Sequence, residues 1–251
     1  IVVGGGPGGY VAAIRAAQLG KKIALIERER VGGVCLNHGC IPTKTLYRTA
    51  EVLKEASSAA SYGVHAENAS LDLAAARSRK QSVVDTLVGG VQSLLKANGV
   101  DVISGEASFA DAKTLVVGDE SYTADAILLA TGSKTAALPI EGIGLDGVLD
   151  STAALRLDEI PQSLVIIGGG VIGVELAGIY RAFGAEVTIV EFLPAILSTL
   201  DGELAKLALK RLTAQGIRIL TATKVTKISG TRGSLTVFAE SVEGTLELQC
   251  S

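Results

Sequence analysis

Several features are scarce or absent in this chain of 251 residues. Three cysteines are too few to staple a small secreted scaffold, so the composition favours an intracellular, cytoplasmic protein. The formal net charge is only -3 and no block of Lys or Arg occurs, which argues against nucleic acid as a partner. No basic leader precedes the first apolar residues, so we expect no targeting peptide.

Long apolar runs are also missing. The most membrane-like run covers residues 164–185, but Glu175 and Arg181 interrupt it and its glycines gather at one end. We therefore expect no transmembrane helix and no membrane partner. The apolar fraction of 48% can still supply the core of one large domain or two ordinary ones.

The two ends of the sequence carry little that would open or close a domain. The chain contains no methionine, even at position 1, and starts directly on the strand-like segment IVVGGG. It ends on LELQCS without a terminating element. We expect this sequence to be part of a longer chain.

An internal repeat organises the sequence. Residues 1–27 align without a gap with residues 165–191, and each copy reads as a strand, a glycine turn, a helix and a second strand that ends at an acid. The turn glycines and terminal acids are Gly4, Gly6, Gly9 and Glu27 in the first copy, and Gly168, Gly170, Gly173 and Glu191 in the second.

The repeated G-x-G-x-x-G pattern is typical of dinucleotide binding. Its first glycine permits a tight turn, the second lets pyrophosphate approach the backbone, and the third lets the helix pack close to the strand. The phosphates then meet the helix N-terminus, and the acid can accept hydrogen bonds from an adenosine ribose. One copy could be an ordinary connecting turn, but two copies with the same acid spacing predict two bound dinucleotide cofactors.

The remaining segments predict an α/β fold with two doubly wound, Rossmann-like nucleotide-binding domains. Residues 42–60 and 70–98 have helical composition and form a helical excursion from the first sheet. Short alternating segments between residues 100 and 125 indicate a small β-meander, and a buried-looking strand follows over 126–133. We place the domains at residues 1–149 and 150–251, because glycines loosen the chain before position 150, and we expect the second domain to be incomplete.

The segment GGVCLNHGCIPTK, residues 32–44, places Cys35 and Cys40 five positions apart. In a regular helix their Cα atoms would lie roughly 8.7 Å apart, too far for an unstrained disulfide, so a closed pair requires an irregular backbone. Gly39 can supply that irregularity, and Pro42 can begin a helix just after Cys40, where a thiolate is favoured. Spacing alone leaves both a reactive dithiol and two unlinked structural cysteines open.

A metal site and a redox role for the third cysteine have little support in the sequence. A metal site would use His38 with the two cysteines, but no second Cys or His pair offers the remaining ligand, so His38 fits better as an ordinary turn residue. Cys250 has no comparable context and is interpreted as structural or incidental.

The motifs GGVCLNHGCIPTK and GGGVIGVELAG together resemble the pyridine nucleotide–disulfide oxidoreductases, in motif order and over nearly the whole chain. The match is most similar to members that oxidise dihydrolipoamide. The resemblance implies that dihydrolipoyl thiols reduce a Cys35–Cys40 disulfide, that the dithiol reduces FAD, and that NAD receives the hydride. It also implies a lipoyl-domain substrate, a homodimer when the chain is complete, and a place in a 2-oxoacid dehydrogenase or glycine cleavage complex.

The resemblance assigns roles to individual residues. Cys35 would exchange disulfides with substrate, Cys40 would face the flavin, and Lys44 and Glu175 would form a charged pair near it, although either charge could instead be exposed. Strand-end turns are an alternative explanation for Gly105 and for residues 131–133. The implied FAD positions are Gly4, Gly6, Gly9, Glu27, Lys44, Gly105, Thr131, Gly132 and Ser133, and the implied NAD positions are Gly168, Gly170, Gly173, Glu175, Glu191 and Val225.

The sequence also departs from the family pattern. Val34 and His38 stand where Thr and an apolar or basic residue are more usual. The later FAD-binding aspartate segment and the C-terminal dimerisation domain with its His–Glu acid/base pair have no counterpart, and neither His38 nor His65 matches that pair. We expect weak or no turnover from this chain alone.

Two rival functions remain open. One is an NADPH-dependent reductase of the glutathione or mercuric type, against which Glu191 argues because a carboxylate would repel a 2′-phosphate. The other is a noncatalytic nucleotide-binding or assembly module, which would keep both glycine turns but show no reducible disulfide.

Overall fold

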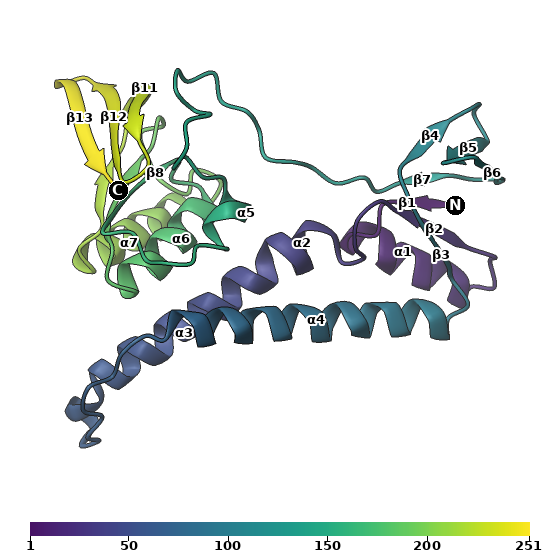
Figure 1. The fold of residues 1–251 in the computed structure, drawn as a ribbon, viewed down its shortest axis with the longest axis horizontal. Coiled ribbons are helices and arrows are strands. Elements are labelled where there is room, and N and C mark those ends of the chain that lie inside the picture. The colour runs from purple at the N-terminus through teal and green to yellow at the C-terminus, as the bar shows by residue number, and fades with distance from the viewer. The chain divides into compact units, whose positions relative to one another are not determined.

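The computed structural model describes residues 1–251 and divides into two compact units that interleave along the sequence. The first unit contains residues 1–44 and 78–134, and the second contains residues 45–77 and 135–251. Figure 1 shows the elements of both units, each of which is described here by itself. The domain boundary near residue 150 remains a prediction.

The first unit is built on a parallel sheet with the strand order β3-β2-β1-β7. Helix α1 (Pro7–Gln18) leaves β1 through the first glycine turn and buries Ala13 completely. Leu25 of β2 and Val88 and Leu95 of helix α4 (Leu73–Ala97) are also fully buried in the core of this unit. The strands are β1 (Val2–Val3), β2 (Ala24–Glu27), β3 (Asp101–Ser104) and β7 (Leu128–Leu129).

The expected helical excursion and β-meander both form. The chain between β2 and β3 contains α2 (Gly33–His38), α3 (Cys40–Ser57), the 3-10 turn η1 (Ala59–Tyr62) and α4 (Leu73–Ala97). Strands β4 (Ala107–Phe109), β5 (Thr114–Val117) and β6 (Glu120–Thr123) then make an antiparallel sheet. Helix α3 begins at Cys40 rather than at Pro42, because a proline fits within the first helical turn, where its missing N–H is not needed.

The strand expected over residues 126–133 forms as β7, but the prediction that it is buried was wrong. Leu128 and Leu129 are 46% and 58% exposed. Strand β7 lies at the edge of its sheet and pairs only with β1, in the register Val2↔Leu128 and Val3↔Leu129. The apolar residues of this segment indicated a strand, but they could not show that it has no neighbouring strand on one side.

The second unit repeats the parallel arrangement with the order β10-β9-β8. Helix α6 follows the second glycine turn and buries Ala177 and Ile179 against Ile189 of β9. Short helix α5 precedes β8, and α7 connects β9 to β10. The bounds are α5 (Ser151–Ala154), β8 (Ser163–Ile167), α6 (Val171–Ala182), β9 (Glu186–Val190), α7 (Gly202–Ala214) and β10 (Arg218–Leu220).

A three-stranded antiparallel sheet follows the parallel one in the second unit. It consists of β11 (Lys224–Thr231), β12 (Ser234–Ser241) and β13 (Gly244–Cys250). The last residue, Ser251, donates its backbone N–H to Oγ of Ser163 at 3.1 Å, and Ser163 N–H donates to Oγ of Ser251 at 3.0 Å. Strand β8 pairs with β9 alone, so it is an edge strand. This parallel sheet has one strand fewer than the parallel sheet of the first unit.

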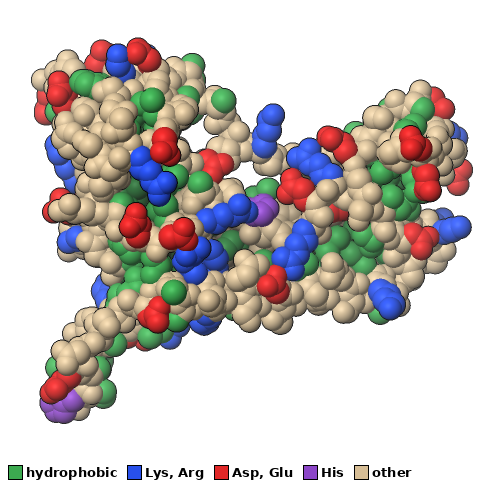
Figure 2. Space-filling view, viewed as in Figure 1, with side chains coloured by type: hydrophobic (Ala, Val, Ile, Leu, Met, Phe, Trp, Pro, Cys, Tyr) green, Lys and Arg blue, Asp and Glu red, His purple; other side chains and the backbone are tan.

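Charged side chains of both signs lie on the visible face (Figure 2). In Figure 2 acidic and basic side chains lie close to one another over much of the visible face. None of the helices combines the length and the apolar character that crossing a bilayer requires. The doubly wound α/β fold expected from the repeat is confirmed, and both glycine turns lie at the carboxyl end of a first strand.

Candidate nucleotide and redox sites

The first glycine turn is held tight by steric requirements. A Cβ at Gly4, where φ is +101°, would lie 2.2 Å from the carbonyl oxygen of Ala130. A Cβ at Gly9 would lie 1.7 Å from the carbonyl oxygen of Gly4. At Gly6 the nearest atom to an added Cβ is the Cα of Gly33, at 3.8 Å. The outer two glycines are therefore needed by the fold, whereas a Cβ at Gly6 would make only an ordinary van der Waals contact.

The second glycine turn has the same construction. A Cβ at Gly173 would lie 2.1 Å from the carbonyl oxygen of Gly168, whose φ is +110°, and a Cβ at Gly170 would meet nothing within 4 Å. The residues before the two helices adopt matching angles, with φ −71° and ψ −177° at Gly6 and φ −72° and ψ 178° at Gly170. Neither helix start is capped by a side chain, so both can offer backbone N–H groups to an anion.

The acids that end the second strands bridge two backbone segments. Glu27 accepts hydrogen bonds from the N–H of Gly5 at 2.6 Å and from that of Glu29 at 2.8 Å. In the second unit Glu191 accepts from Gly169 at 2.6 Å and from Leu193 at 2.7 Å. Each carboxylate oxygen thus has one N–H donor, which leaves it able to accept a second hydrogen bond from a ribose hydroxyl.

Four strand ends meet around the first turn. Glu27 ends β2, Gly105 follows β3, and Thr131 follows the end of β7 by two residues. Gly105 N–H donates to the carbonyl of Glu27 at 2.9 Å, and a Cβ at Gly4 would lie 3.2 Å from the Cα of Thr131. In open α/β sheets ligands bind outside the carboxyl ends of the strands. The structure therefore brings the predicted FAD positions Gly105 and 131–133 to the edge that carries the first glycine turn.

The two cysteines lie on either side of a helix break. Cys35 is in α2, which stops at His38, Gly39 adopts φ −136° and ψ −107°, and Cys40 is the first residue of α3. This is the irregular backbone that a closed pair requires. Both side chains are thiols in this structure, with Cys35 partly buried and Cys40 exposed.

The environment of Cys35 disfavours its thiolate while the pair is reduced. The pKa of Cys35 is raised to about 11, and burial of its side chain is the largest cause. The side-chain hydrogen bond with Cys40 and the charge of Cys40 also raise this pKa, while the positive charge of Lys44 lowers it. Cys35 is therefore a neutral thiol at neutral pH in this state. Spacing and Gly39 could not predict this, because the largest cause is burial of the side chain in the folded structure.

The cysteine segment lies directly against the first glycine turn. Gly32 donates its N–H to the carbonyl of Gly5 at 2.7 Å. A Cβ at Gly33, where φ is +56°, would lie 2.6 Å from the Cα of Gly6. The start of α2 thus packs against the turn at Gly6. This places the dithiol next to the first predicted dinucleotide site.

Several other predicted residues have been placed individually. Val225 is buried in β11, where it pairs with Ala239, so its predicted NAD contact rests on backbone or neighbouring atoms. Lys44 belongs to the first unit and Glu175 to the second, and their pairing stays a prediction. His38 lies 3.7 Å from Glu29, while His65 is exposed. No group of three His, Cys, Asp or Glu side chains lies together in a way that could hold a metal ion.

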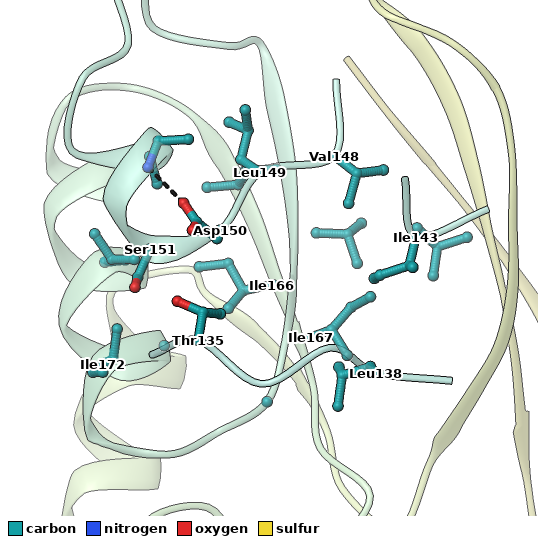
Figure 3. Close-up of a pocket in the computed structure, with 18 of the residues that line it drawn as sticks. Thr135, Leu138, Ile143, Val148, Leu149, Asp150, Ser151, Ile166, Ile167 and Ile172 are labelled. Atoms are coloured by element: carbon teal, nitrogen blue, oxygen red, sulfur yellow. Dashed lines mark hydrogen bonds between the residues drawn. The ribbon is translucent and has the colours of Figure 1, made fainter. Parts of the chain in front are cut away.

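Sequence reasoning missed a cavity in the second unit. It has a volume of about 910 Å³ and is lined by β8, by the second glycine turn and by residues of β11–β13. Figure 3 shows Ile166 and Ile167 of β8 facing it, with Leu138 and Val148 from the segment before β8. Cys250 also lines this cavity, whereas Glu191 does not. All five residues of β8 are only partly buried, a feature that the structure shows and the sequence does not.

Comparisons with known proteins agree with these features. A family model described as pyridine nucleotide-disulphide oxidoreductase matches residues 1–250. The chain is 42% identical to a dihydrolipoyl dehydrogenase of Rhizobium etli over 98% of its own length and 56% of that protein. It is 47% identical to the dihydrolipoyl dehydrogenase of Geobacillus stearothermophilus over 88% of its length and 48% of that protein.

A solved structure is also similar. The HOCl-induced flavoprotein disulfide reductase RclA from Escherichia coli superposes with a TM-score of 0.82 at 34% identity, covering 98% of this chain and 53% of that one. The chain therefore spans about half the length of the relatives that it matches.

Proposed function

Because the chain belongs to the pyridine nucleotide-disulphide oxidoreductase family, we propose that it forms the two nucleotide-binding units of a flavoprotein that oxidises dihydrolipoamide and reduces NAD. One observation carries this proposal. The start of the cysteine helix lies on the first glycine turn, through the 2.7 Å hydrogen bond from Gly32 to Gly5 and the close contact of Gly33 with Gly6. A dithiol beside a dinucleotide turn is the arrangement that disulfide-to-flavin electron transfer needs.

The first unit would hold FAD. Its pyrophosphate would meet the uncapped N-terminus of α1 after Gly6, its ribose would use the remaining acceptor capacity of Glu27, and Gly105 with residues 131–133 would complete the same edge of the sheet. When bound, FAD would supply the redox chemistry that links the dithiol to NAD. The second unit would hold NAD at Gly170 and Glu191 in the equivalent way.

The cysteines would perform the exchange step. A thiolate of dihydrolipoamide attacks Sγ of Cys35, the Cys35–Cys40 bond breaks, and Cys40 leaves as a thiolate. The second substrate thiol then displaces Cys35 and closes the cyclic lipoamide disulfide, so the substrate is oxidised by two electrons and the pair is reduced by two. Lys44 supports this step because its positive charge favours a Cys35 thiolate.

Several features of the complete protein follow the same proposal. Its substrate would be a lipoyl group carried by a partner domain, in a 2-oxoacid dehydrogenase or glycine cleavage complex, and the complete chain would form a cytoplasmic homodimer. Lys44 and Glu175 would pair near the flavin, and Val225 would border the nicotinamide site. The relatives that share 42% and 47% identity, both dihydrolipoyl dehydrogenases, support this choice over a glutathione- or mercuric-type reductase.

Thiol counting tests the redox pair directly. The chain has three cysteines, so after air oxidation and unfolding we expect one reactive thiol, and after mild reduction by dithiothreitol we expect all three. A Cys250→Ser control should lower both counts by one and leave their difference unchanged. Three thiols before reduction would show that Cys35 and Cys40 do not pair and would favour a noncatalytic nucleotide-binding module.

A further inference from the structure

The side chain of Asn37 lies between the two cysteines in sequence and ties α2 to the segment before it. Its Nδ2 donates to the carbonyl oxygen of Gly33 at 3.0 Å, to that of Val31 at 3.2 Å and to that of Arg30 at 3.4 Å. Three acceptors around one nitrogen fix the orientation of the amide, because Oδ1 in the same place would face three carbonyl oxygens. Asn37 therefore clamps the end of α2 to its beginning and to the preceding turn.

The other atom of the amide has no partner. Oδ1 of Asn37 is buried and accepts no hydrogen bond from another group of the protein. An unsatisfied buried acceptor costs about 1–3 kcal/mol, roughly what one or two hydrogen bonds of Nδ2 return. The amide therefore adds little net stability, and its contribution lies in the position that it imposes.

That position matters because α2 has few other means of staying in place. It has six residues, far fewer than a helix needs to be stable alone, and its N-cap Gly32 has no side chain to cap it. Gly32 and Gly33 are the residues that touch the first glycine turn. By bonding Gly33 and Val31, Asn37 links the helix that carries Cys35 to the backbone that rests on this turn.

From this geometry we propose that Asn37 is a positioning residue for the Cys35–Cys40 couple, a role that rests on the proposed function of that pair. A disulfide tolerates only Cα separations of about 4.4–6.8 Å, whereas two thiols tolerate a wider range. When α2 is loosened, the Cα separation between Cys35 and Cys40 lies outside this range for more of the time. The clamp therefore stabilises the disulfide relative to the dithiol.

The test is the equilibrium of the FAD-supplemented chain with reduced and oxidised dithiothreitol. Each reduced dithiothreitol gives two electrons and two protons, breaks the Cys35–Cys40 bond and closes its own disulfide. With Asn37→Ala we expect the disulfide to become about tenfold easier to reduce, which corresponds to a rise of about 30 mV in its potential. The melting temperature should change little, because alanine removes the unpaired Oδ1 together with the bonds of Nδ2.

Two variants make the result decisive. Asn98 also donates to a carbonyl four residues earlier, that of Leu94 at 2.8 Å, but it lies at the end of α4, so Asn98→Ala should leave the equilibrium unchanged. Asn37→Ser is milder, since its hydroxyl can still bond the Gly33 carbonyl, and we expect a shift of about threefold. This variant decides the question if the alanine variant does not fold.

The two proposals fail in different ways. A wild-type chain that never forms the disulfide overturns the proposed function and this inference with it. A wild-type chain that forms the disulfide, together with an unchanged equilibrium in the folded Asn37 variants, overturns the inference alone.

Discussion

Replacing Gly173 with alanine is expected to destabilise the second unit strongly, although alanine is normally the better helix residue. A Cβ at Gly173 would lie 2.1 Å from the carbonyl oxygen of Gly168, so the helix start must move away from the turn. We expect a loss of about 3 kcal/mol, which lowers the melting temperature by about 6–12 °C. Thermal unfolding followed by circular dichroism measures this.

Two glycines in the same unit serve as controls. Alanine at Gly178, further along α6, meets nothing within 4 Å and should stabilise the helix by about 0.5–1 kcal/mol. Alanine at Gly170 also meets nothing, so the fold should survive, but its methyl group would occupy the space where pyrophosphate approaches the backbone. NAD binding should fall roughly a hundredfold without a loss of melting temperature. Normal NAD binding by a folded Gly170→Ala chain would contradict the assigned site.

The second large effect is expected in the choice between NAD and NADP. Glu191 is almost fully buried and holds the N–H groups of Gly169 and Leu193, so its carboxylate cannot turn away from a cofactor bound at this turn. A 2′-phosphate would meet this negative charge in a poorly solvated place. We expect the chain to bind NAD more tightly than NADP, and Glu191→Gln to reduce the ratio of the two affinities by about two orders of magnitude.

Calorimetric titration of both nucleotides measures this ratio. Glu27→Gln is the matched control, because Glu27 makes the same pair of backbone bonds in the first unit. This control should weaken FAD binding and leave the NAD to NADP ratio unchanged. A wild-type preference for NADP would instead support the glutathione- or mercuric-type alternative.

The repeated turns could be predicted from sequence because their requirements are local. A side chain at Gly9 or Gly173 would clash with a carbonyl oxygen only five residues earlier in the chain. The acids at positions 27 and 191 accept a hydrogen bond from the N–H of the residue that follows the first glycine of each turn. The break between the cysteines was also predictable from Gly39, since the constraint lies within one short segment. In these places the residue types in the sequence follow directly from the local backbone geometry.

Features that depend on residues far apart in the sequence could not be predicted from local motifs. The exposure of Leu128 follows from the place of β7 at a sheet edge, and the high pKa of Cys35 follows mainly from burial. Asn37 looked like an ordinary member of the cysteine motif, because its clamp is visible only when the carbonyls of Arg30 and Val31 are in place. The more exposed thiol is that of Cys40, so burial alone does not assign the exchange role to Cys35.

The most direct test of the central claim is NAD reduction driven by dihydrolipoamide in the complete protein and in its Cys35→Ser and Cys250→Ser variants. Without the Cys35 sulfur no disulfide can receive the substrate electrons, so we expect turnover to fall by about a thousandfold or more, while bound FAD still shows its absorption spectrum. Cys250→Ser should stay close to the wild type. Turnover near the wild-type level in Cys35→Ser would contradict the account, because electrons would then reach the flavin without the proposed disulfide.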